Sequence, residues 1–477
     1  MEALAAATRT HAAIAPEDAL AELRTRVKQE PLLEILCRAL RNKSDFDDAD
    51  LHLVGGSVRD ALLGLPNYDL DLATALTPLE IVARLERADI RVVATGLKHQ
   101  TVTAVPVSGG PNVEITTFRG PGLSPNGGVI ASNSIVEDLC YRDFTINAMA
   151  LNLLSGELID PHCAVDDLKQ LTLKAVGSPH ERYSEDPLRM LRLLRLACRL
   201  DLNIEAQTLA TVRKDGPLLK TVSIERVRDE FSKLLVSPHP GRGLRLLARL
   251  DLLVHFLPEL IPCIDFEQNR FHPLDVFEHT ISVVEKTSSD LVLRLSALFH
   301  DIGKPPTLSI DAETGDRHFF RHESIGAEMT ATLMERLRYP HRTIDAVVTL
   351  VATHMRPLEA GPGGLRRLLR DTGELFPAWR ELKEADAASC AMDPEVLSSQ
   401  LRIFDTAMIE VQAGPAVSPL KNLALNGHDV LSAGVPAGPQ VGLALRALHE
   451  RVLDDPSLNT RERLLEILSA EFLSAPR

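Results

Sequence analysis

A short run of glycines, one arginine and several aspartates stands near the start of this chain: Leu53-Val54-Gly55-Gly56-Ser57-Val58-Arg59-Asp60, then Tyr68-Asp69-Leu70-Asp71. The apolar residues before Gly55 predict a buried strand, and a helix is expected to open at Ser57. Gly55 and Gly56 let the backbone approach a phosphate closely, and the helix start presents N–H groups to it. Arg59 on the first turn adds a charge-assisted contact. The run therefore predicts a site for a nucleotide phosphate.

The aspartates Asp69 and Asp71 alternate with leucines. On a strand, residues two apart share a face, so both carboxylates are expected to point one way while the leucines enter the core. Two oxygen ligands on one face suit Mg²⁺, which binds through one or two carboxylates plus substrate phosphates. Glu114, on another predicted strand, is either a third carboxylate of this group or the ion-pair partner of Arg119 or Arg142.

The composition limits the class of protein. A chain of 477 residues is too long for one hydrophobic core, so several domains are expected. A hydrophobic content of 45% and a charged content of 25% are typical of a soluble globular protein. The six cysteines form no C-x-x-C pair, which favours reduced thiols and a cytoplasmic location. No apolar run approaches the ~18 residues that span a bilayer, so no membrane contact is expected.

The net charge of −14 restricts how the chain binds nucleic acid. Phosphates respond to a local patch of charge rather than to the global sum. Any RNA-binding surface must therefore be a confined basic stripe on an otherwise acidic body.

The spacing of apolar residues changes along the chain. Residues 1 to about 50 predict amphipathic helices, and a 3.6-residue spacing dominates from Ser178 to the end. Between them the pattern is mixed, and Gly120–Gly128 predicts a loop because it is rich in glycine and proline and has no periodicity. The expected fold class is α+β, with a mixed sheet followed by helices. The strands are predicted at Leu51–Val54, Leu70–Ala73, Arg91–Ala94, Thr101–Val107, Val113–Phe118 and Ala148–Leu154.

Three further motifs follow the first in order. They are Glu137-Asp138-Leu139 with Tyr141-Arg142-Asp143-Phe144-Thr145-Ile146-Asn147-Ala148, then Glu185-Asp186-Pro187-Leu188-Arg189-Met190-Leu191-Arg192-Leu193-Leu194-Arg195, and Ser223-Ile224-Glu225-Arg226-Val227-Arg228-Asp229-Glu230. From Leu51 to about Leu260 the chain resembles the family of class II tRNA nucleotidyltransferases and bacterial poly(A) polymerases, and within it the CCA-adding enzymes. The resemblance implies a polymerase-beta-like nucleotidyltransferase head followed by an all-helical neck, body and tail. It also implies transfer of CMP and AMP from CTP and ATP to the 3′ end of tRNA without a template.

The resemblance assigns roles to individual residues of this chain. Asp69 and Asp71 match the catalytic carboxylates that hold Mg²⁺. The other matches bind the nucleotide: the triphosphate at Gly55, Gly56, Arg59 and Arg142, the base at Asp186 and Arg189, and further parts at Arg192 and Arg195.

The arginine spacing supports the base-reading role independently. Arg189, Arg192, Arg195 and Arg199 are three or four residues apart, so they share one helix face. Asp186, expected to begin this helix, accepts a hydrogen bond from a base amino group, and the adjacent arginine donates in a fixed fork. Four like charges on one face are unfavourable unless an anion neutralises them. The alternative interpretation is a solvated basic face.

Two departures from the family pattern bear on specificity. Tyr141 stands where the family has an arginine, which removes one expected electrostatic contact. The segment 120–134 is uncharged and looks shorter than the Asp-Gly-Arg-x-Pro-like loop of full CCA-adding enzymes. In the family that loop helps to switch the site from CTP to ATP, and enzymes that add only the two cytidines have it shortened. Addition of CC alone is therefore an alternative to addition of CCA.

A second group of metal-ligand candidates lies in the helical half. It consists of His279, His300, Asp301 and Asp386, with His322 and His354 as candidates for a second ion or a phosphate. Over about 271–388 the order of these residues resembles the HD domain of metal-dependent phosphohydrolases. Imidazole and carboxylate together suit Mn²⁺, Fe²⁺, Co²⁺ or Ni²⁺ better than Mg²⁺ alone. The domain either hydrolyses a phosphoester or serves only as a structural body.

These patterns divide the chain into five expected parts. They are a helical extension (1–50), the nucleotidyltransferase head (51–175), a neck and body that recognise the base and bind RNA (176–270), the HD domain (271–390) and a helical tail (391–477). Two other functions remain open: a poly(A) polymerase, or an HD phosphohydrolase whose head only binds RNA.

Basic residues in the HD part are also candidates for binding tRNA. Arg366, Arg367 and Arg370 follow a glycine-rich turn, where they either contact tRNA phosphate or form a solvated helix face.

Overall fold

The computed structural model describes residues 16–40, 51–66, 70–96, 100–105, 112–123, 129–268, 273–414 and 422–473. Asp69, one of the two predicted catalytic carboxylates, lies outside these residues. The chain divides into two compact units, Met1–Val222 and Ser223–Arg477. The boundary falls within the segment 176–270 that the sequence predicts as neck and body. Within the described ranges, no helix is long and apolar enough to cross a membrane.

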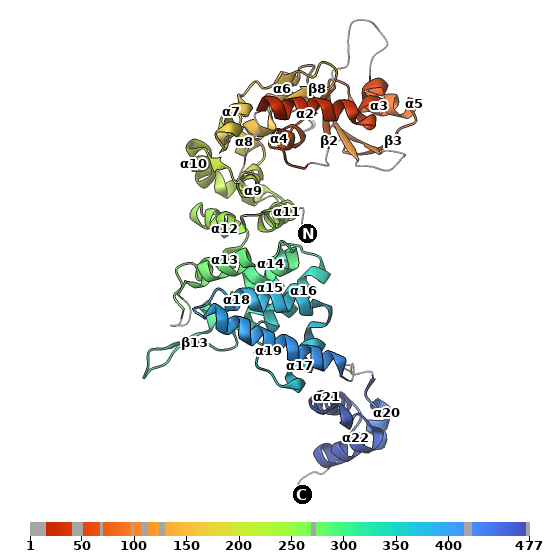
Figure 1. Ribbon diagram of the computed structural model, residues 1–477, viewed down its shortest axis with the longest axis vertical. Helices are drawn as coiled ribbons and strands as arrows, with labels where there is room; N and C mark the ends of the chain where they lie inside the picture. Colours follow the sequence, from red (N-terminus) through yellow and green to blue (C-terminus); the bar gives the residue numbers. More distant parts are fainter. Residues whose placement is uncertain are drawn as a thin grey trace. The chain divides into compact units, whose positions relative to one another are not determined.

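The first unit is built on a mixed sheet with the strand order β3-β4-β5-β2-β1-β8-β9 (Figure 1). β2 and β5 are parallel, and the other neighbouring pairs are antiparallel. All six predicted strands are present within a few residues, which confirms the α+β class. The strands are β1 His52–Val54, β2 Leu70–Thr74, β3 Arg91–Gly96, β4 Thr101–Val105, β5 Val113–Thr117, β8 Ala150–Asn152 and β9 Leu158–Ile159.

The position of β2 in the sheet decides where its carboxylate lies. β2 is an inner strand, flanked by β1 and β5, and its residues from Leu72 onward are buried. In the parallel register of β2 and β5, Asp71 is paired with Glu114. Side chains of directly paired residues point to the same face of a sheet. The fold therefore places the carboxylates of Asp71 and Glu114 side by side, which is one of the two alternatives predicted for Glu114.

Helices cover this sheet and include the N-terminal segment. α2 (Pro16–Gln29) packs against α4 (Gly56–Leu62), and α3 (Pro31–Leu40) packs against α5 (Pro78–Arg87). The predicted N-terminal helices are thus confirmed, and they belong to the packing of the head (Figure 1). The later helices of this unit are α6 Ile135–Cys140, α7 Ala164–Lys169, α8 Pro179–Glu185, α9 Arg189–Leu200 and α10 Ala206–Asp215, with the short pair β10 Thr172–Leu173 and β11 Asn203–Ile204.

The predicted loop at Gly120–Gly128 is wrong over its first residues. β6 (Arg119–Leu123) pairs with β7 (Val129–Ala131) in an antiparallel ribbon, and residues 124–128 lie outside the described part. A Cβ at Gly120 would come within 3.1 Å of the Ala131 carbonyl oxygen. The glycine here permits close approach of two strands rather than a turn, so a rule that counts glycine as a breaker gives the wrong answer.

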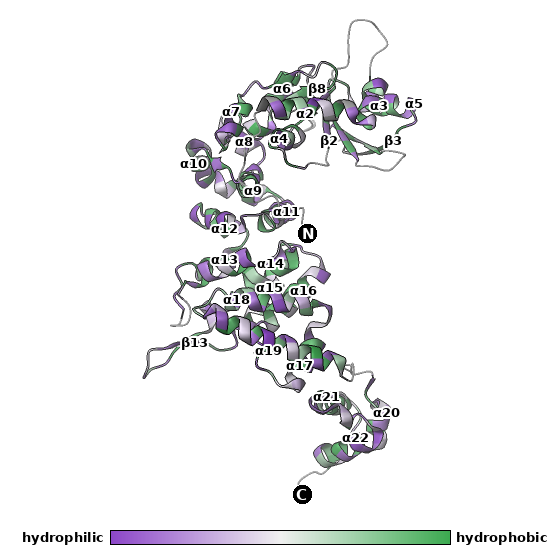
Figure 2. Cartoon of the chain, in the orientation of Figure 1, coloured by the Kyte–Doolittle hydropathy of each residue, from purple (hydrophilic) through white to green (hydrophobic). Residues whose placement is uncertain are grey.

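The second unit is helical, as predicted. α14 (Leu291–Phe299) is its most apolar central element, with seven buried residues, and Figure 2 shows it as predominantly hydrophobic. It packs against α13, α16 and α18. The helices are α11 Ile224–Leu235, α12 Pro240–Arg249, α13 Val276–Lys286, α15 His322–Arg336, α16 His341–Thr353, α17 Pro362–Thr372, α18 Phe376–Ala387, α19 Pro394–Ala413, α20 Gly427–Ser432, α21 Pro439–Asp454 and α22 Arg461–Leu468, with the hairpin β12 Leu308–Ile310 and β13 Arg317–Phe319.

The arginines of α17 are bound to the tail helix α21 instead of being solvated. Arg367 Nε lies 2.6 Å from a Glu450 carboxylate oxygen, and its Nη2 lies 2.9 Å from Asp454. Arg370 also pairs with Glu450, and Arg366 donates to the Leu453 carbonyl at 2.9 Å. These half-buried guanidinium groups hold the tail helix, and their contact with tRNA phosphate stays a prediction.

Candidate functional site

Gly55 lies between a cation and a carboxylate at the end of β1. Its backbone has φ +68° and ψ −132°, a conformation open mainly to glycine. A Cβ built there would lie 3.0 Å from Arg142 Nη1 and 4.0 Å from Asp71 Oδ2. The structure thus brings together Gly55, Asp71 and Arg142, which the sequence predicted as parts of one nucleotide site.

The ion pairs of the head decide between the two alternatives predicted for Glu114. Arg142 pairs with Asp138 at 2.9 Å, using its Nε and Nη2. Glu114 is exposed and forms no ion pair with Arg119 or Arg142 in the described part of the chain. The salt-bridge alternative is therefore not observed, and Glu114 stays available beside Asp71.

Gly55→Ala is predicted to lower kcat/KM for nucleotide addition by about 10- to 100-fold, because the positive φ is strained for alanine by about 1–3 kcal/mol and the methyl group pushes against Arg142. Steady-state kinetics with varied nucleotide measures the effect. Gly177→Ala is the matched control, since Gly177 has φ +63° but a Cβ there meets nothing within 4 Å. Equal losses in both variants would contradict a role of Gly55 in the site.

Arg59 lies beneath Gly56 and not on an open helix surface. Its Nη2 is 3.3 Å from the position of a Cβ on Gly56. Its Nε and Nη2 bind Asp60 Oδ1 at 2.8 and 2.6 Å, and its Nη1 donates to Asn147 Oδ1. Burial lowers the pKa of Arg59, against the opposing effect of Asp60. Arg59 therefore stabilises the turn at Gly55 and Gly56 through its hydrogen bonds to Asp60 and Asn147.

Asp186 does not begin helix α9, contrary to the prediction. It is the C-terminal cap of α8, with extended backbone angles of φ −147° and ψ 99°. α9 starts three residues later at Arg189. The reason is Pro187, because a residue before proline is disfavoured in helical conformation. The carboxylate of Asp186 accepts the Leu188 N–H at 3.2 Å, which places it at the junction of the two helices.

Helix α9 carries its arginines on one face, as predicted. Arg192, Arg195 and Arg199 are exposed or half-buried, whereas the leucines between them are buried. Arg189, at the first turn, donates to the Tyr141 carbonyl at 3.1 Å and binds Glu185 at 2.8 Å. Tyr141 itself lies under the guanidinium of Arg182, 5.7 Å from its ring centre.

A continuous chain of polar contacts leaves α9, passes through the head and returns to α9. Asp143 receives Arg192 Nε at 2.8 Å and Asn147 Nδ2 at 2.9 Å. Asn147 accepts from Arg59, Arg59 binds Asp60, and Asp60 Oδ2 binds Arg199 Nη2 at 3.1 Å. We call this the α9 polar chain; its members are Arg192, Asp143, Asn147, Arg59, Asp60 and Arg199.

The α9 polar chain supplies anions to two arginines of the face, because Arg192 pairs with Asp143 and Arg199 pairs with Asp60. Burial raises the pKa of Asp143, but Arg192 and the Asn147 hydrogen bond outweigh it, so the pKa lies below its ordinary value. The roles of Asp60, Asp143 and Asn147 were not predicted from the sequence. Asp60 and Asp143 stand next to Arg59 and Arg142, and Asn147 belongs to the same motif as Arg142, so their positions could have identified them.

Asp60→Asn is predicted to destabilise the head by about 3 kcal/mol, because it removes the shared counter-charge of Arg59 and Arg199 and leaves a buried guanidinium without an anion. Urea unfolding followed by circular dichroism measures the change. Asp166→Asn is the control, because Asp166 is largely exposed and forms an ion pair only with the exposed Lys169, at 3.4 Å, in the described part of the chain. A shift no larger than that of the control would contradict the argument.

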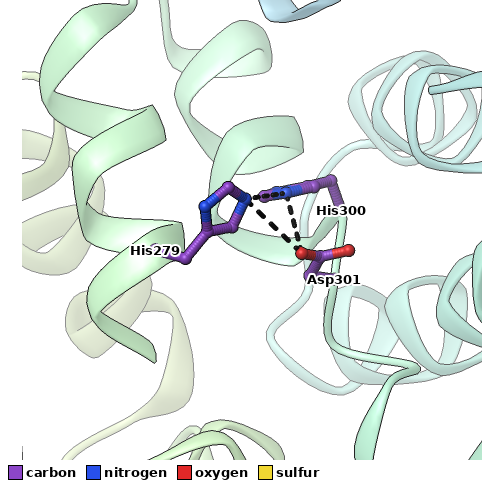
Figure 3. Close-up of side chains that lie close together, drawn as sticks. All are labelled: His279, His300 and Asp301. Atoms are coloured by element: carbon purple, nitrogen blue, oxygen red, sulfur yellow. Dashed lines mark hydrogen bonds and ion pairs between the residues drawn. The ribbon is translucent and has the colours of Figure 1, made fainter. Parts of the chain in front are cut away.

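The second unit gathers the predicted histidines and aspartates into one buried cluster. His279 on α13 points toward His300 and Asp301 at the end of α14 (Figure 3). His279 Nε2 lies 3.3 Å from His300 Nε2 and 3.6 Å from Asp301 Oδ2. Asp386 Oδ1 lies 3.1 Å from His279 Nε2 and 3.8 Å from His300 Nε2. The four residues predicted as one metal site therefore lie together.

A second triad shares the same aspartate through its other oxygen. His322 Nε2 and His354 Nε2 lie 3.4 and 3.8 Å from Asp301 Oδ1, and 3.3 Å from each other. Each triad has three ligand atoms close enough for one ion. Asp301 thus stands between two triads of imidazole and carboxylate.

Hydrogen bonds orient three of these histidines. The Nδ1 atoms of His300, His322 and His354 lie 2.7–2.8 Å from backbone carbonyl oxygens, so Nδ1–H donates and Nε2 is left as the ligand atom. Burial lowers the pKa of His300, but Asp301 and Asp386 outweigh it and raise that pKa above its ordinary value. Burial lowers the pKa of His354 to about 3, which keeps it neutral. Burial raises the pKa of Asp301, but His300 and Lys304 lower it well below its ordinary value. The donor set suits a divalent transition metal.

A cavity of about 460 Å³ opens onto this cluster. Its lining includes His322, His354 and Asp386, together with Lys304 and Lys383. Lys304 Nζ is buried, 2.6 Å from Asp301 Oδ2 and 2.7 Å from Gln268 Oε1. Neither lysine was predicted from the sequence as part of this site. Lys304 follows His300-Asp301 closely in the chain, which was the signal that could have identified it.

The fold and the two sites together define a nucleotidyltransferase head joined to an HD domain. Three family descriptions match the chain: "Poly A polymerase head domain" over residues 51–174, "Probable RNA and SrmB- binding site of polymerase A" over 201–264, and "HD domain" over 271–392.

Curated relatives cover most of the chain. An A-adding tRNA nucleotidyltransferase of Deinococcus radiodurans is 35% identical over 83% of this chain and 90% of the relative. A CC-adding tRNA nucleotidyltransferase of Thermus thermophilus is 31% identical, covering 85% and 90%. A CCA-adding enzyme of Lacticaseibacillus paracasei is 30% identical, covering 88% and 92%. The chain belongs to the tRNA nucleotidyltransferase family, which confirms the resemblance seen in the sequence, and it is an enzyme.

A solved structure supports the same assignment. The crystal structure of the Bacillus stearothermophilus CCA-adding enzyme in complex with CTP aligns over 93% of this chain and 98% of that chain. The TM-score is 0.66 and the sequence identity is 25%. The nucleotidyltransferase and HD domains both imply the use of divalent metal ions.

Proposed function

We propose that this enzyme adds C and A nucleotides to the 3′ end of tRNA, using CTP and ATP and no nucleic-acid template. The observation that carries the proposal is the convergence of Gly55, Arg142 and Asp71 at the start of α4. The α9 polar chain ties that site to the helix whose first turn carries Arg189. The names of the relatives, which include A-adding, CC-adding and CCA-adding enzymes, agree with the proposal.

In the proposed reaction the tRNA 3′-hydroxyl oxygen forms a bond to the α-phosphorus of the nucleotide. The bond from that phosphorus to the bridging oxygen breaks, pyrophosphate leaves, and the hydroxyl proton passes to solvent. Arg142 and the N–H groups at the start of α4 bind the triphosphate. Asp69 and Asp71, with Glu114 beside Asp71, would hold Mg²⁺. A bound Mg²⁺ at such a site supplies positive charge to the phosphates and lowers the pKa of the attacking hydroxyl.

The base is read at the junction of α8 and α9. Arg189 is fixed by Glu185, by the Arg182 carbonyl at 3.2 Å and by the Tyr141 carbonyl. A guanidinium held by the protein keeps its remaining donors in one direction. Asp186 supplies an acceptor beside it. One acceptor and planar donors match the polar edges of both C and A.

The test uses three tRNA transcripts that end before CCA, after C and after CC. Each is incubated with Mg²⁺ and CTP, ATP or both, and the products are resolved at single-nucleotide steps. Addition of CCA, of CC alone or of A alone to the appropriate end supports the proposal and defines the specificity. Long A tails on any RNA would overturn it in favour of a poly(A) polymerase. No extension of any transcript would also overturn it.

The cellular setting follows from the substrate. We infer a cytoplasmic location, which agrees with the six cysteines being free thiols in the structure.

We also infer that the HD domain hydrolyses phosphoesters with a transition metal such as Mn²⁺, Co²⁺ or Ni²⁺. The observation that favours it is the pair of triads that share Asp301 at the bottom of an open cavity. Water oxygen would bond to phosphorus, the ester P–O bond would break, and the alcohol would leave with a proton. Lys304 and Lys383 add positive charge near the phosphate position.

The hydrolase is tested with p-nitrophenyl phosphate and Mn²⁺, together with metal analysis of the purified chain. His279→Ala is expected to lose hydrolysis and the affinity of one metal ion. His341→Ala, at an exposed residue on α16, is expected to keep both. Absence of metal and of hydrolysis in the unmodified chain would overturn the inference.

A further inference from the structure

A cysteine thiol lies beside the histidine and aspartate cluster of the second unit. The Cys390 sulfur forms a third group of ligand atoms with His279 and Asp386, and all three atoms lie within 4.8 Å of one another. The other two members already belong to the predicted metal site. Cys390 is half-buried and lines the cavity that opens onto the cluster. The cavity therefore presents a sulfur atom to an ion, beside nitrogen and oxygen atoms.

The turn that follows α18 directs this thiol toward the cluster. Asp386 lies in the last turn of α18, and Cys390 comes four residues later. The Ser389 N–H donates to the Asp386 carbonyl at 2.9 Å, and the Cys390 N–H donates to the Ala387 carbonyl at 3.2 Å. Residues four apart on a helical path share one side. The carboxylate of Asp386 and the thiol of Cys390 therefore lie on the same side of this segment.

The same turn is attached to α13, the helix that carries His279. The hydroxyl of Ser389 is buried and accepts from both Ser282 Oγ and Lys286 Nζ at 3.0 Å. It donates in turn to the Ala385 carbonyl at 2.8 Å. These bonds fix the segment after α18 against α13, so the sulfur is held near His279 by the fold itself. Ligands that the protein holds in place before an ion arrives are typical of a metal site.

The contacts of the thiol within the protein are weak. Its S–H donates to the Asp386 carbonyl at 3.4 Å, and a thiol is a poor hydrogen-bond donor. Burial, followed by the carboxylates of Asp386 and Asp301, raises the pKa of Cys390 to about 12, so the thiol is neutral before an ion binds. An activated cysteine nucleophile has the opposite property, a lowered pKa. The position of Cys390 thus suits a ligand better than a nucleophile.

We propose that Cys390 is a thiolate ligand of the ion held by His279 and Asp386, and that it favours Zn²⁺ or Co²⁺ over Mn²⁺ there. The proposal rests on the proposed metal site of the HD domain. On binding, a sulfur–metal bond forms, the S–H bond breaks and the proton leaves to solvent. Thiolate ligands select softer ions such as Zn²⁺, whereas carboxylates suit Mn²⁺. Cys390 therefore sets the identity of the metal and takes no part in breaking an ester.

The first experiment loads the metal-free full chain with Co²⁺ and records its absorption. A cobalt–thiolate bond gives a charge-transfer band in the near ultraviolet, which nitrogen and oxygen ligands lack. The band is expected in the unmodified chain and is expected to disappear in Cys390→Ser. Cys163→Ser is the matched control, since Cys163 is an exposed thiol of the first unit, and it should keep the band.

The second experiment measures the Kd of Zn²⁺ and of Mn²⁺ by competition with a chromogenic chelator. Zn²⁺ binds most sites more tightly than Mn²⁺, so the informative quantity is the change in the ratio of the two affinities. Partners outside the ligand shell already contribute about 10- to 100-fold, so Cys390→Ser is expected to weaken Zn²⁺ by about 100-fold and Mn²⁺ by less than about threefold. Urea unfolding of the metal-free variant, which should match the unmodified chain, separates this loss from a folding defect.

The outcomes separate the thiolate ligand from the hydrolase. Loss of the band in Cys390→Ser together with a selective loss of Zn²⁺ affinity supports the proposal. Co²⁺ binding without the band, a band that persists in Cys390→Ser, or equal weakening of Zn²⁺ and Mn²⁺ overturns it and leaves the metal site standing. Failure of the unmodified chain to bind any of the three ions overturns both the proposal and the hydrolase. The thiolate band without hydrolysis of p-nitrophenyl phosphate overturns the hydrolase alone.

Discussion

Asp71→Asn should lower kcat/KM for nucleotide addition by about 10³-fold or more while the head remains folded. Asp71 lies on the inner strand β2, with Glu114 beside it on β5 and Gly55 at the end of β1. The asparagine keeps the size and shape of the side chain, but it removes the negative charge that a divalent ion needs. The loss of several kcal/mol of charge stabilisation in the transition state corresponds to this factor.

Single-turnover addition to a tRNA transcript measures the effect of Asp71→Asn. Asp166→Asn, which changes an exposed carboxylate of the same unit, serves as the control and should keep full activity. Glu114→Gln tests the neighbouring carboxylate, and a comparable loss would identify it as part of the same group. Activity of Asp71→Asn within tenfold of the unmodified enzyme would refute the assignment of this carboxylate.

Gly303→Ala should destabilise the second unit by about 3 kcal/mol and abolish metal binding by the His322–His354 triad. A Cβ at Gly303 would lie 2.2 Å from the His322 carbonyl oxygen and 2.7 Å from the Gly326 N. Both are backbone atoms, so no side chain can move aside to relieve the clash. The start of α15 would have to shift, and His322 would move away from Asp301. A loss of stability and a loss of ligand geometry therefore come from the same contact.

Urea unfolding followed by Trp379 fluorescence gives the stability of Gly303→Ala, and calorimetric titration with Mn²⁺ gives the metal affinity. Gly361→Ala is the control, because a Cβ there meets nothing within 4 Å and the φ of −66° is ordinary. Its unfolding should change by no more than about 0.5 kcal/mol. If Gly303→Ala bound Mn²⁺ like the control, the close approach of the two backbones would not be what places His322.

Much of the head could be predicted because its signals are local. Each predicted strand is a short run in which apolar residues predominate or alternate with polar ones. The conformation of Gly55 is likewise set within its own turn. The pairing of Asp71 with Glu114 was predicted only as one of two alternatives, because strand register depends on the whole sheet and not on either strand. That Asp69 points to the same face of the sheet as Asp71 remains a prediction, because Asp69 lies outside the described residues.

Some errors were local, as at Asp186 before Pro187, and others arose where the partner of a residue is distant in the sequence. Arg367 pairs with Glu450, more than eighty residues away, and no local pattern marks that pair. Arg59 was expected on a phosphate, but its immediate neighbour Asp60 and the distant Asn147 hold it inside the head. The four arginines of α9 were expected to need an outside anion, whereas Asp143 and Asp60 already supply two. The spacing of charged residues predicts a charged helix face, but it does not predict which groups neutralise that charge.

The α9 polar chain has a thermodynamic consequence. This polar chain begins at Arg192 and ends at Arg199, two turns apart on the same helix. Between these ends it passes through Arg59, which lies next to the Gly55–Gly56 turn. In the proposed function, tilting α9 to follow a different base would stretch or shorten contacts at both ends of the α9 polar chain. By reciprocity, a group that changes the free energy at one end changes the affinity at the other by the same factor. We therefore expect a nucleotide to gain this coupling between its base and its triphosphate, and a fragment that carries only one of them to lack it.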